Sequence, residues 1–354
     1  MIKPSCHSAE WIAEVANRYK YPDTQIIEKV IKALTLLELL SKSGCPFIFK
    51  GGSAVMLMLG DITHRLSIDV DIICPPGTEI EQYLTDYKAY GFTNLQFIER
   101  KSAGKNVPKS HSKFFYQLAY NNDNNKESYI LLDVLYEDTH YNQVNNIDIV
   151  GPFLEIDGEP SKVRVPSVGD ILGDKLTAYA PNTTGIPYYK NGNSRSMEII
   201  KQLYDISRLF ERVDELTITS KSFHRIAQVE MGYRGMEGDV NQIFEDIRQT
   251  SLLLATRGKA GVGDFALLQN GISRIKNMMF NGKYYIEDAI VDSARASYIA
   301  TCIEKGISAI EKYDGDITGM MIAPTLTNKL EKLKKLLPEA YYYWCKTSEM
   351  LIKK

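Results

Sequence analysis

The spacing of apolar residues changes along the chain, from short runs in its first part to helical periodicity in its second. Short apolar runs bounded by glycine, proline or polar residues indicate β-strands. The expected strands are 45–50, 65–74, 92–100, 113–120, 128–136 and 162–165. Helical spacing indicates helices at 8–20, 23–42 and 78–90, and one that follows Gly52 and ends at Gly60. The polar stretch between the strands at 113–120 and 128–136 suggests a hairpin.

From Ser167 onward, helical periodicity continues almost to the end of the chain. After a helix that begins at Ser167, the expected helices are 195–213, 219–231, 239–257, 263–280, 285–306 and 325–347. These patterns predict an α+β protein. A mixed β-sheet domain flanked by helices would occupy residues 1–165, and an α-helical domain would occupy residues 166–354.

Two aspartates stand one residue apart in the strand expected at 65–74. Aspartate is disfavoured inside strands and is rarely buried without a partner. Because strand side chains alternate, we expect Asp69 and Asp71 on one face and Ile68, Val70 and Ile72 on the core face. Neighbouring carboxylates repel each other unless a cation lies between them. Oxygen ligands suit Mg²⁺ or Mn²⁺, so the pair predicts a metal site.

Residues on either side of this pair suggest that the metal serves a phosphate substrate. Asp133 lies in the apolar run 128–136 and would supply a third carboxylate from a neighbouring strand. Gly51 and Gly52 allow a tight turn, and Ser53 starts a helix whose N-terminus attracts phosphate. Singly, these features also fit an ordinary turn and a strand-edge residue. Together they predict transfer of a nucleotide, with metals stabilising the attacking and leaving oxygens.

Composition narrows the possible partners and compartment. The chain has 354 residues and a formal net charge of −2, which argues against a generally basic nucleic-acid-binding surface. Its five cysteines show no CxxC pair and are expected to be reduced thiols. There is neither a secretory signal nor a run of about 18 apolar residues. We therefore expect a cytoplasmic protein without a membrane partner.

Three segments resemble the AbiEii/AbiGii toxin branch of the nucleotidyltransferases. "KGGSAVMLMLGDITHRLSIDVDII" is similar to the first motif of that family. "VGDILGDKLTAYA" and "KQLYDISRLF" are similar to its second and third blocks, so the resemblance covers roughly residues 47–210. It implies a DNA polymerase β-like nucleotidyltransferase fold, an NTP substrate and a divalent cation, Mg²⁺ or Mn²⁺.

The resemblance also assigns roles to individual residues. Metal would be held by Asp69 and Asp71, and the general pattern of the wider superfamily would add Asp133. Triphosphate would be contacted by Gly51, Gly52, Ser53, Arg65 and Lys175. Arg65 and Ser67 would brace the metal-binding strand. Lys175 would neutralise triphosphate charge from a helical domain that contributes to the active-site cleft, and Asp205 would act as a base or organise the lysine.

Without the resemblance, ordinary alternatives remain for the later residues. Lys175 could be a surface lysine, and Asp205 could pair with Arg208 on a helix surface. Gln202 stands where many relatives have an acid.

Two loops and one helix are candidates for substrate contacts. The loop at 100–113 contains five cations that could receive an RNA backbone, or it could be a solvated loop. The loop at 180–195 offers Tyr188 and Tyr189 for base stacking. The leucine stripe at 325–347 fits a core-packing helix. His64 is the one histidine near the first motif.

Three functions remain open at this point. The leading one is transfer of a nucleoside monophosphate to RNA, with the 3′ end of tRNA as the acceptor implied by the family. The enzyme would then be the toxin of a type IV-like toxin–antitoxin or phage-abortive system, restrained by a cognate antitoxin. The alternatives are a small-molecule nucleotidyltransferase, as in antibiotic modification, and a non-catalytic module that binds nucleotide or a protein partner.

Overall fold

The computed structural model describes residues 1–60, 65–98, 108–119, 127–323, 326 and 328–352. The chain divides into two compact units. The first comprises Met1–Ser167 and Met278–Gly282, and the second comprises Val168–Asn277 and Lys283–Lys354. The segment 278–282 thus returns to the first unit, which the sequence patterns do not indicate.

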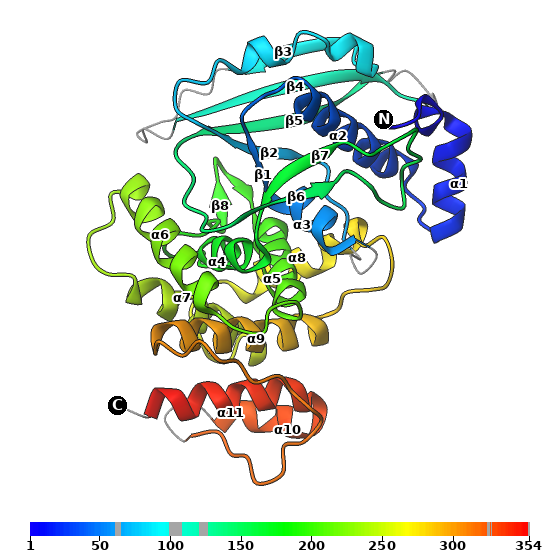
Figure 1. Ribbon diagram of the computed structural model, residues 1–354. Helices are drawn as coiled ribbons and strands as arrows, with labels where there is room; N and C mark the ends of the chain where they lie inside the picture. Colours follow the sequence, from blue (N-terminus) through cyan, green and yellow to red (C-terminus); the bar gives the residue numbers. More distant parts are fainter. Residues whose placement is uncertain (61–64, 99–107, 120–126, 324–325, 327, 353–354) are drawn as a thin grey trace. The chain divides into compact units, whose positions relative to one another are not determined.

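A five-stranded mixed sheet with strand order β1-β2-β5-β4-β3 forms the centre of the first unit (Figure 1). Its strands are β1 Ile48–Lys50, β2 Val70–Cys74, β3 Asn94–Ile98, β4 Lys109–Gln117 and β5 Glu127–Tyr136. β2 and β5 run parallel, and the other neighbouring strands run antiparallel. The predicted α+β class is confirmed, and so is the hairpin of β4 and β5.

The α-helices of this unit among the described residues are α1 Ala9–Tyr19, α2 Thr24–Lys42 and α3 Gly51–Leu59. Asp23 caps α2, because its carboxylate accepts hydrogen bonds from the amides of Gln25 and Ile26. α2 lies across one face of the sheet (Figure 1). Alternate residues of β5, namely Ile130, Leu132 and Val134, are buried. The residues between them, including Asp133, therefore belong to the opposite face.

β2 begins later than the sequence pattern predicts. The extended segment 65–69 does not join the sheet, so its assignment as part of the strand was wrong. Arg65 instead forms an isolated bridge with Met279, and the Leu66 amide donates to the carbonyl of Met278 at 2.7 Å. Ile68 is half-buried, whereas Val70 and Ile72 are each 1% exposed.

Two other elements of the first unit differ from expectation. The helix expected at 78–90 is a pair of 3₁₀ turns, Ile80–Tyr83 and Tyr87–Tyr90. The strand expected at 162–165 is β7 Lys162–Pro166, and its antiparallel partner β6 Val144–Asp148 was not predicted. The sequence of β6, VNNID, has too few apolar residues to give a strand pattern, because most of it is exposed.

The second unit is helical. Its helices are α4 Val168–Ala178, α5 Ser196–Phe210, α6 Thr217–Arg234, α7 Asn241–Ala255, α8 Phe265–Ile275, α9 Ile286–Glu304, α10 Leu333–Leu336 and α11 Pro338–Ile352. A small hairpin, β8 Tyr189–Lys190 with β9 Asn193–Ser194, lies in the loop before α5. α4 packs closely on α6, since a Cβ on Gly173 would lie 2.7 Å from the Thr219 carbonyl oxygen. No helix of the described chain is both long and apolar enough to cross a bilayer.

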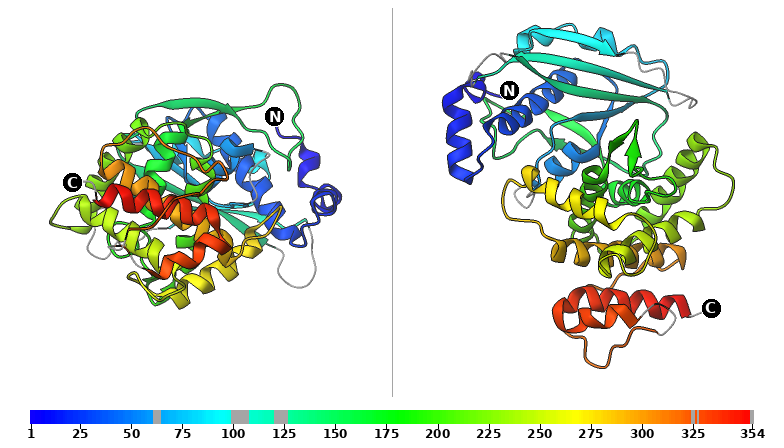
Figure 2. Two further views of the ribbon diagram at one scale, coloured as in Figure 1. Left: turned by 90° about the horizontal axis from the view of Figure 1, so that it is seen from below. Right: turned by 180° about the vertical axis from the view of Figure 1, so that it is seen from behind.

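The single helix expected at 325–347 is interrupted. A 3₁₀ turn, Asn328–Lys332, leads into α10, and α11 begins afresh at Pro338. Leu337 has φ −145° and ψ 73°, outside the helical region. Proline lacks an amide donor and disfavours the helical conformation of the preceding residue, which explains the break. α11 packs against α9, as predicted for a core helix (Figure 2).

Candidate functional site

Four polar residues form one row across the sheet of the first unit. Lys50 of β1 is the register partner of Asp71 in β2. Asp71 is the register partner of Asp133 in β5, and Asp133 is that of His111 in β4. Register partners on neighbouring strands project from the same face. The row therefore lies on the face opposite α2, and it brings together two of the three predicted metal ligands.

The third predicted ligand, Asp69, lies immediately before β2. Asp69 is exposed, and Asp71 is partly buried. The Ser53 hydroxyl donates a hydrogen bond to the carbonyl oxygen of Asp69 at 2.5 Å. Because Ser53 is only 1% exposed, its hydroxyl ties α3 to the start of β2. The contact with phosphate predicted for Ser53 would thus have to come from its backbone N–H, in the first turn of α3.

The two glycines at the start of α3 permit close approach to these side chains. Gly51 has φ +77°, and a Cβ on it would overlap Oδ2 of Asp71 and lie 2.8 Å from its Cγ. A Cβ on Gly52 would lie 2.8 Å from Oγ of Ser67 and 2.9 Å from Nη2 of Arg65. The helix N-terminus therefore lies directly beside the Asp71 carboxylate and the Arg65 guanidinium.

Arg65 is 4% exposed, and its Nη1 donates to the carbonyl oxygen of Leu66 at 3.0 Å. With its guanidinium beside Gly52 and its backbone bridged to Met279, it joins three segments of the first unit. This burial favours the bracing role expected for Arg65.

His111 is a candidate site residue that the sequence analysis missed. Its Nδ1 makes a hydrogen bond with Oδ1 of Asp133. The side chains of His111 and Asp133 are 11% and 33% exposed, respectively. Side chains alternate between the two faces of β4, so the sequence shows that His111 shares a face with Asp133 only once the register of the hairpin is known. That register was not predicted, so the dispersed histidines gave no signal.

Lys175 and Asp205 form a buried ion pair in the second unit. Nζ of Lys175 lies 2.9 Å from Oδ2 of Asp205 and donates to Oε1 of Gln202 at 3.0 Å. The Lys175 and Asp205 side chains are 8% and 2% exposed. The alternative of a solvated lysine is therefore wrong. Arg208 pairs with Asp292 and Glu211 instead of Asp205. A buried ammonium requires such a partner, so Asp205 fixes the position of Lys175.

The segments proposed for substrate contact are only partly described. Residues 100–107 of the basic loop and His64 lie outside the described residues. Lys109 and Lys113 belong to β4, and Nζ of Lys113 lies 4.2 Å from the ring centroid of Tyr129.

The two tyrosines of the loop at 180–195 differ in exposure. The Tyr188 hydroxyl is buried, and a Cβ on Gly263 would lie 3.0 Å from its Cζ. Tyr189 is 56% exposed. Base stacking is therefore available to Tyr189, whereas Tyr188 packs into its own unit.

The residues present fit a hard divalent cation without forming a preformed cage. Among the residues that the structure describes, no group of three or more His, Cys, Asp and Glu side chains is close enough to hold a metal. Asp69, Asp71 and Asp133 nevertheless offer only carboxylate oxygens, beside a helix N-terminus that Gly51 keeps open. Mg²⁺ typically binds through one or two carboxylates and completes its shell with water and substrate phosphates.

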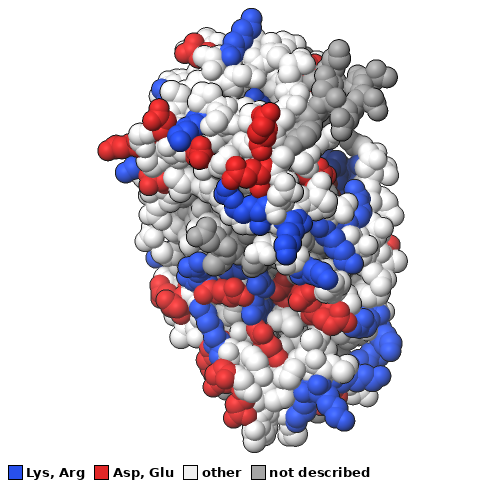
Figure 3. All heavy atoms as spheres, turned by 90° about the vertical axis from the view of Figure 1, so that its right-hand side faces the viewer, with Lys and Arg blue, Asp and Glu red and all other residues white. Residues whose placement is uncertain are grey.

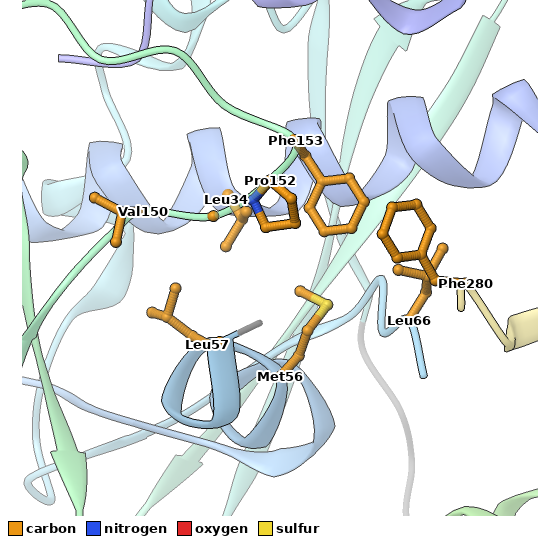
Figure 4. A pocket seen from close by; sticks show the side chains of 10 residues that line it. Leu34, Met56, Leu57, Leu66, Val150, Pro152, Phe153 and Phe280 are labelled. Carbon is orange, nitrogen blue, oxygen red and sulfur yellow. The ribbon is translucent and has the colours of Figure 1, made fainter. Parts of the chain in front are cut away.

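A pocket elsewhere in the first unit has a different character. It lies between α2, α3 and the segment 150–153, and Met56, Leu57, Phe153 and Phe280 point toward it (Figure 4). All of its lining side chains are apolar. A nucleoside triphosphate needs hydrogen-bond donors, so this pocket does not match one. On the face seen in Figure 3, both basic and acidic side chains are present.

Comparison with known proteins agrees with these observations. The family model described as "Nucleotidyl transferase AbiEii toxin, Type IV TA system" matches residues 35–279, more than half of the chain. No curated protein sequence matches this chain.

Among solved structures, the chain is similar to MenT4, a nucleotidyltransferase toxin from Mycobacterium tuberculosis. The identity is 13%, the TM-score is 0.50, and the match covers 94% of this chain and 98% of MenT4. JHP933 from Helicobacter pylori matches at 14% identity and TM-score 0.41, over 79% of this chain and 91% of JHP933. At these identities the structural likeness concerns the fold, whereas the family match concerns the sequence. The chain belongs to the AbiEii family, the nucleotidyltransferase toxins of type IV toxin–antitoxin systems.

Proposed function

We propose that this nucleotidyltransferase moves a nucleoside monophosphate from an NTP to the 3′ end of an RNA, with tRNA as the first candidate, and that the reaction requires Mg²⁺ or Mn²⁺. The observation that carries the proposal is the register of Asp71 with Asp133, next to the glycine-opened N-terminus of α3. Carboxylates on adjacent strands are costly without a cation, and a helix N-terminus favours phosphate.

Each residue group has a defined task in this reaction. The backbone N–H groups of Gly51, Gly52 and Ser53 bind the triphosphate. Asp69, Asp71 and Asp133 hold the divalent cation, which when bound stabilises the charge on the attacking and leaving oxygens. The acceptor hydroxyl oxygen forms a bond to the α-phosphorus and gives up its proton to solvent, while the bond from the α-phosphorus to the bridging oxygen breaks and pyrophosphate leaves.

Lys175 is proposed to neutralise triphosphate charge. Its ammonium is held by Asp205 and Gln202, so its position does not depend on substrate. Asp205 then acts by organising the lysine, which is one of the two roles that the sequence resemblance allowed.

The RNA acceptor and the antitoxin rest on separate support. Exposed Tyr189, and Lys113 beside Tyr129, are groups suited to base stacking and to phosphate contacts. The family's toxin–antitoxin description favours a cognate antitoxin as a partner. The near-neutral net charge favours the second candidate, a small-molecule acceptor. The non-catalytic alternative is not retained, because the family is one of transferases.

The test is incubation of the protein with each α-³²P-labelled NTP, Mg²⁺ and total tRNA. The control is the Asp69→Ala/Asp71→Ala variant, with and without EDTA for both proteins. We expect label on RNA only with the wild type and only without chelator. Label on small hydroxylated acceptors but not on RNA would favour the second candidate. Full activity of the double variant would refute the assignment of the carboxylates.

A further inference from the structure

We infer that His111 is a positioning residue that orients the Asp133 carboxylate for metal binding. The inference rests on the proposed function, because it concerns a proposed metal ligand. His111 would not touch the substrate itself. It would act on the reaction only through Asp133.

The backbone brings the two residues together. β4 and β5 pair antiparallel over nine residue pairs, from Lys109↔Leu135 to Gln117↔Glu127, and His111 lies directly opposite Asp133. In antiparallel strands, directly opposite side chains have Cβ atoms about 4.5–5.5 Å apart. The contact is therefore set by strand register and not by a mobile loop.

The hydrogen bond has a defined direction. An ionised carboxylate only accepts hydrogen bonds, so Nδ1 of His111 must carry the hydrogen that Oδ1 of Asp133 receives. The imidazole is 11% exposed, which restricts its alternative orientations. Within the described part of the chain, no hydrogen bond to Oδ2 of Asp133 accompanies this contact. One oxygen is thus engaged and the other is left for a ligand.

Orientation matters because the outer torsion of aspartate is soft. The χ2 angle of Asp is broad and roughly two-fold, so an unrestrained carboxylate samples many orientations. Asp71 is the register partner of Asp133 on its other side. A carboxylate held by His111 on one side can present its second oxygen toward the cation shared with Asp71. Removing such an outer-shell hydrogen bond typically weakens metal affinity 10–100-fold.

The test measures the binding of Mn²⁺ to the whole 354-residue chain, by using EPR to determine how much Mn²⁺ remains free. The thermal unfolding of each variant is measured beside it. Asp71→Asn defines the binding that belongs to this site. His111→Leu removes the donor, whereas His111→Asn can keep an N–H near the position of Nδ1. His140→Leu is the matched control, because His140 is a partly exposed histidine near Glu137.

We expect His111→Leu to weaken Asp71-dependent Mn²⁺ binding about 10–100-fold. His111→Asn should recover most of the affinity, and His140→Leu should not change it. In an Asp133→Asn background, His111→Leu should have little further effect, because the histidine acts through that carboxylate.

Four results would overturn the inference, and they differ in what they leave standing. Unchanged Mn²⁺ affinity in His111→Leu, or an equal loss in the Asp133→Asn background, would refute the role of His111 alone. Absence of any Asp71-dependent Mn²⁺ binding in the wild type would refute the metal site of the proposed function and this inference with it. A purely structural role would lower the unfolding temperature of His111→Leu and His111→Asn alike, without rescue of affinity.

Discussion

Gly51 lies so close to Asp71 that a Cβ atom added to the glycine would lie 2.8 Å from the carboxylate carbon. Gly51→Ala must therefore displace the Asp71 side chain or the first turn of α3. It also places an L-residue at φ +77°, which costs about 1–2 kcal/mol. We expect nucleotide transfer to fall at least about 10-fold, because displacements of about 1 Å in a positioned group cost rate on that scale or more.

Gly44→Ala is the matched control for this substitution. Gly44 has φ +76°, and a Cβ on it would meet nothing within 4 Å. Gly44→Ala should lose only the unfolding free energy that the positive φ costs, Gly51→Ala should lose at least as much in urea denaturation, and only Gly51→Ala should lose activity. Equal activities would show that the close approach of Gly51 to Asp71 has no functional role.

The buried pair of Lys175 and Asp205 makes a second prediction, which separates stability from activity. Lys175→Met removes the ammonium that pairs with the buried Asp205 carboxylate, and should cost about 3–5 kcal/mol of unfolding free energy. Replacing both residues, as Lys175→Met/Asp205→Leu, should restore most of that stability, since buried pairs can often be replaced by apolar residues. Transfer activity should remain lost in the double variant if Lys175 neutralises triphosphate.

Lys312→Met provides the comparison for the pair in the same unit. Lys312 lies 3.7 Å from Asp214, whose side chain is fully exposed, so its removal should change stability by less than about 1 kcal/mol. An active double variant of Lys175 and Asp205 would limit the pair to a structural role.

His7 makes the stability of the first unit depend on pH. Burial, and then the nearby charge of Lys32, lower the pKa of His7 to about 4 from an ordinary value of 6.5. The folded state therefore keeps His7 neutral over a range in which the unfolded chain takes up a proton. Stability should fall as pH falls from about 6.5 toward 4, by at most about 3 kcal/mol from this residue.

Urea denaturation of the wild type and His7→Asn at pH 4.5, 5.5, 6.5 and 7.5 measures this contribution. The difference in unfolding free energy between the two proteins should change with pH below 6.5 and stay constant above 7. A constant difference over the whole range would mean that His7 titrates normally in the folded protein.

The sequence predicts those site residues that lie close together along the chain better than those that only strand pairing brings together. Asp69, Asp71 and the glycines before α3 are close together along the chain, and their motif indicates a phosphate and metal site. The relation of Asp71 to Asp133 requires a parallel pairing of strands that are 62 positions apart in the sequence. Only the shared carboxylate chemistry of the two residues suggests this pairing, and no hydrophobic pattern indicates it. His111 was missed for the same reason, since only the register of β4 on β5 puts it beside Asp133.

Local patterns also fail where distant segments compete for the backbone. The run 65–74 has strand periodicity, but Leu66 bonds to Met278, more than 200 residues away, and only Val70–Cys74 enter the sheet. Nothing near Leu66 in the sequence indicates that partner. By contrast, the break before Pro338 was available from the sequence, because proline disfavours a continuous helix there.

Asp292 makes a prediction for the packing of α9 in the second unit. Its side chain is 1% exposed, and it accepts hydrogen bonds from Nη2 of Arg208 at 3.1 Å and from the Tyr284 hydroxyl at 2.8 Å. Asp292→Ala would leave the buried Tyr284 hydroxyl without this acceptor, and the half-buried Arg208 would keep only Glu211 as an ion-pair partner among those described for it. We expect a loss of about 3–5 kcal/mol, the usual cost of removing one partner of a buried pair.

Asp292→Asn separates charge from hydrogen bonding at this position. The amide oxygen still accepts a hydrogen bond, so this variant should lose less stability than Asp292→Ala. The control is Glu287→Ala, at the exposed pair with Arg257, which should change stability by less than about 1 kcal/mol. Urea denaturation, monitored by tryptophan fluorescence, measures the stability of all three variants. Trp344 reports on the second unit because it is 1% exposed in α11. Equal stabilities of Asp292→Ala and Glu287→Ala would mean that the Arg208–Asp292 pair does not hold α5 against α9, and that their apolar contacts alone do so.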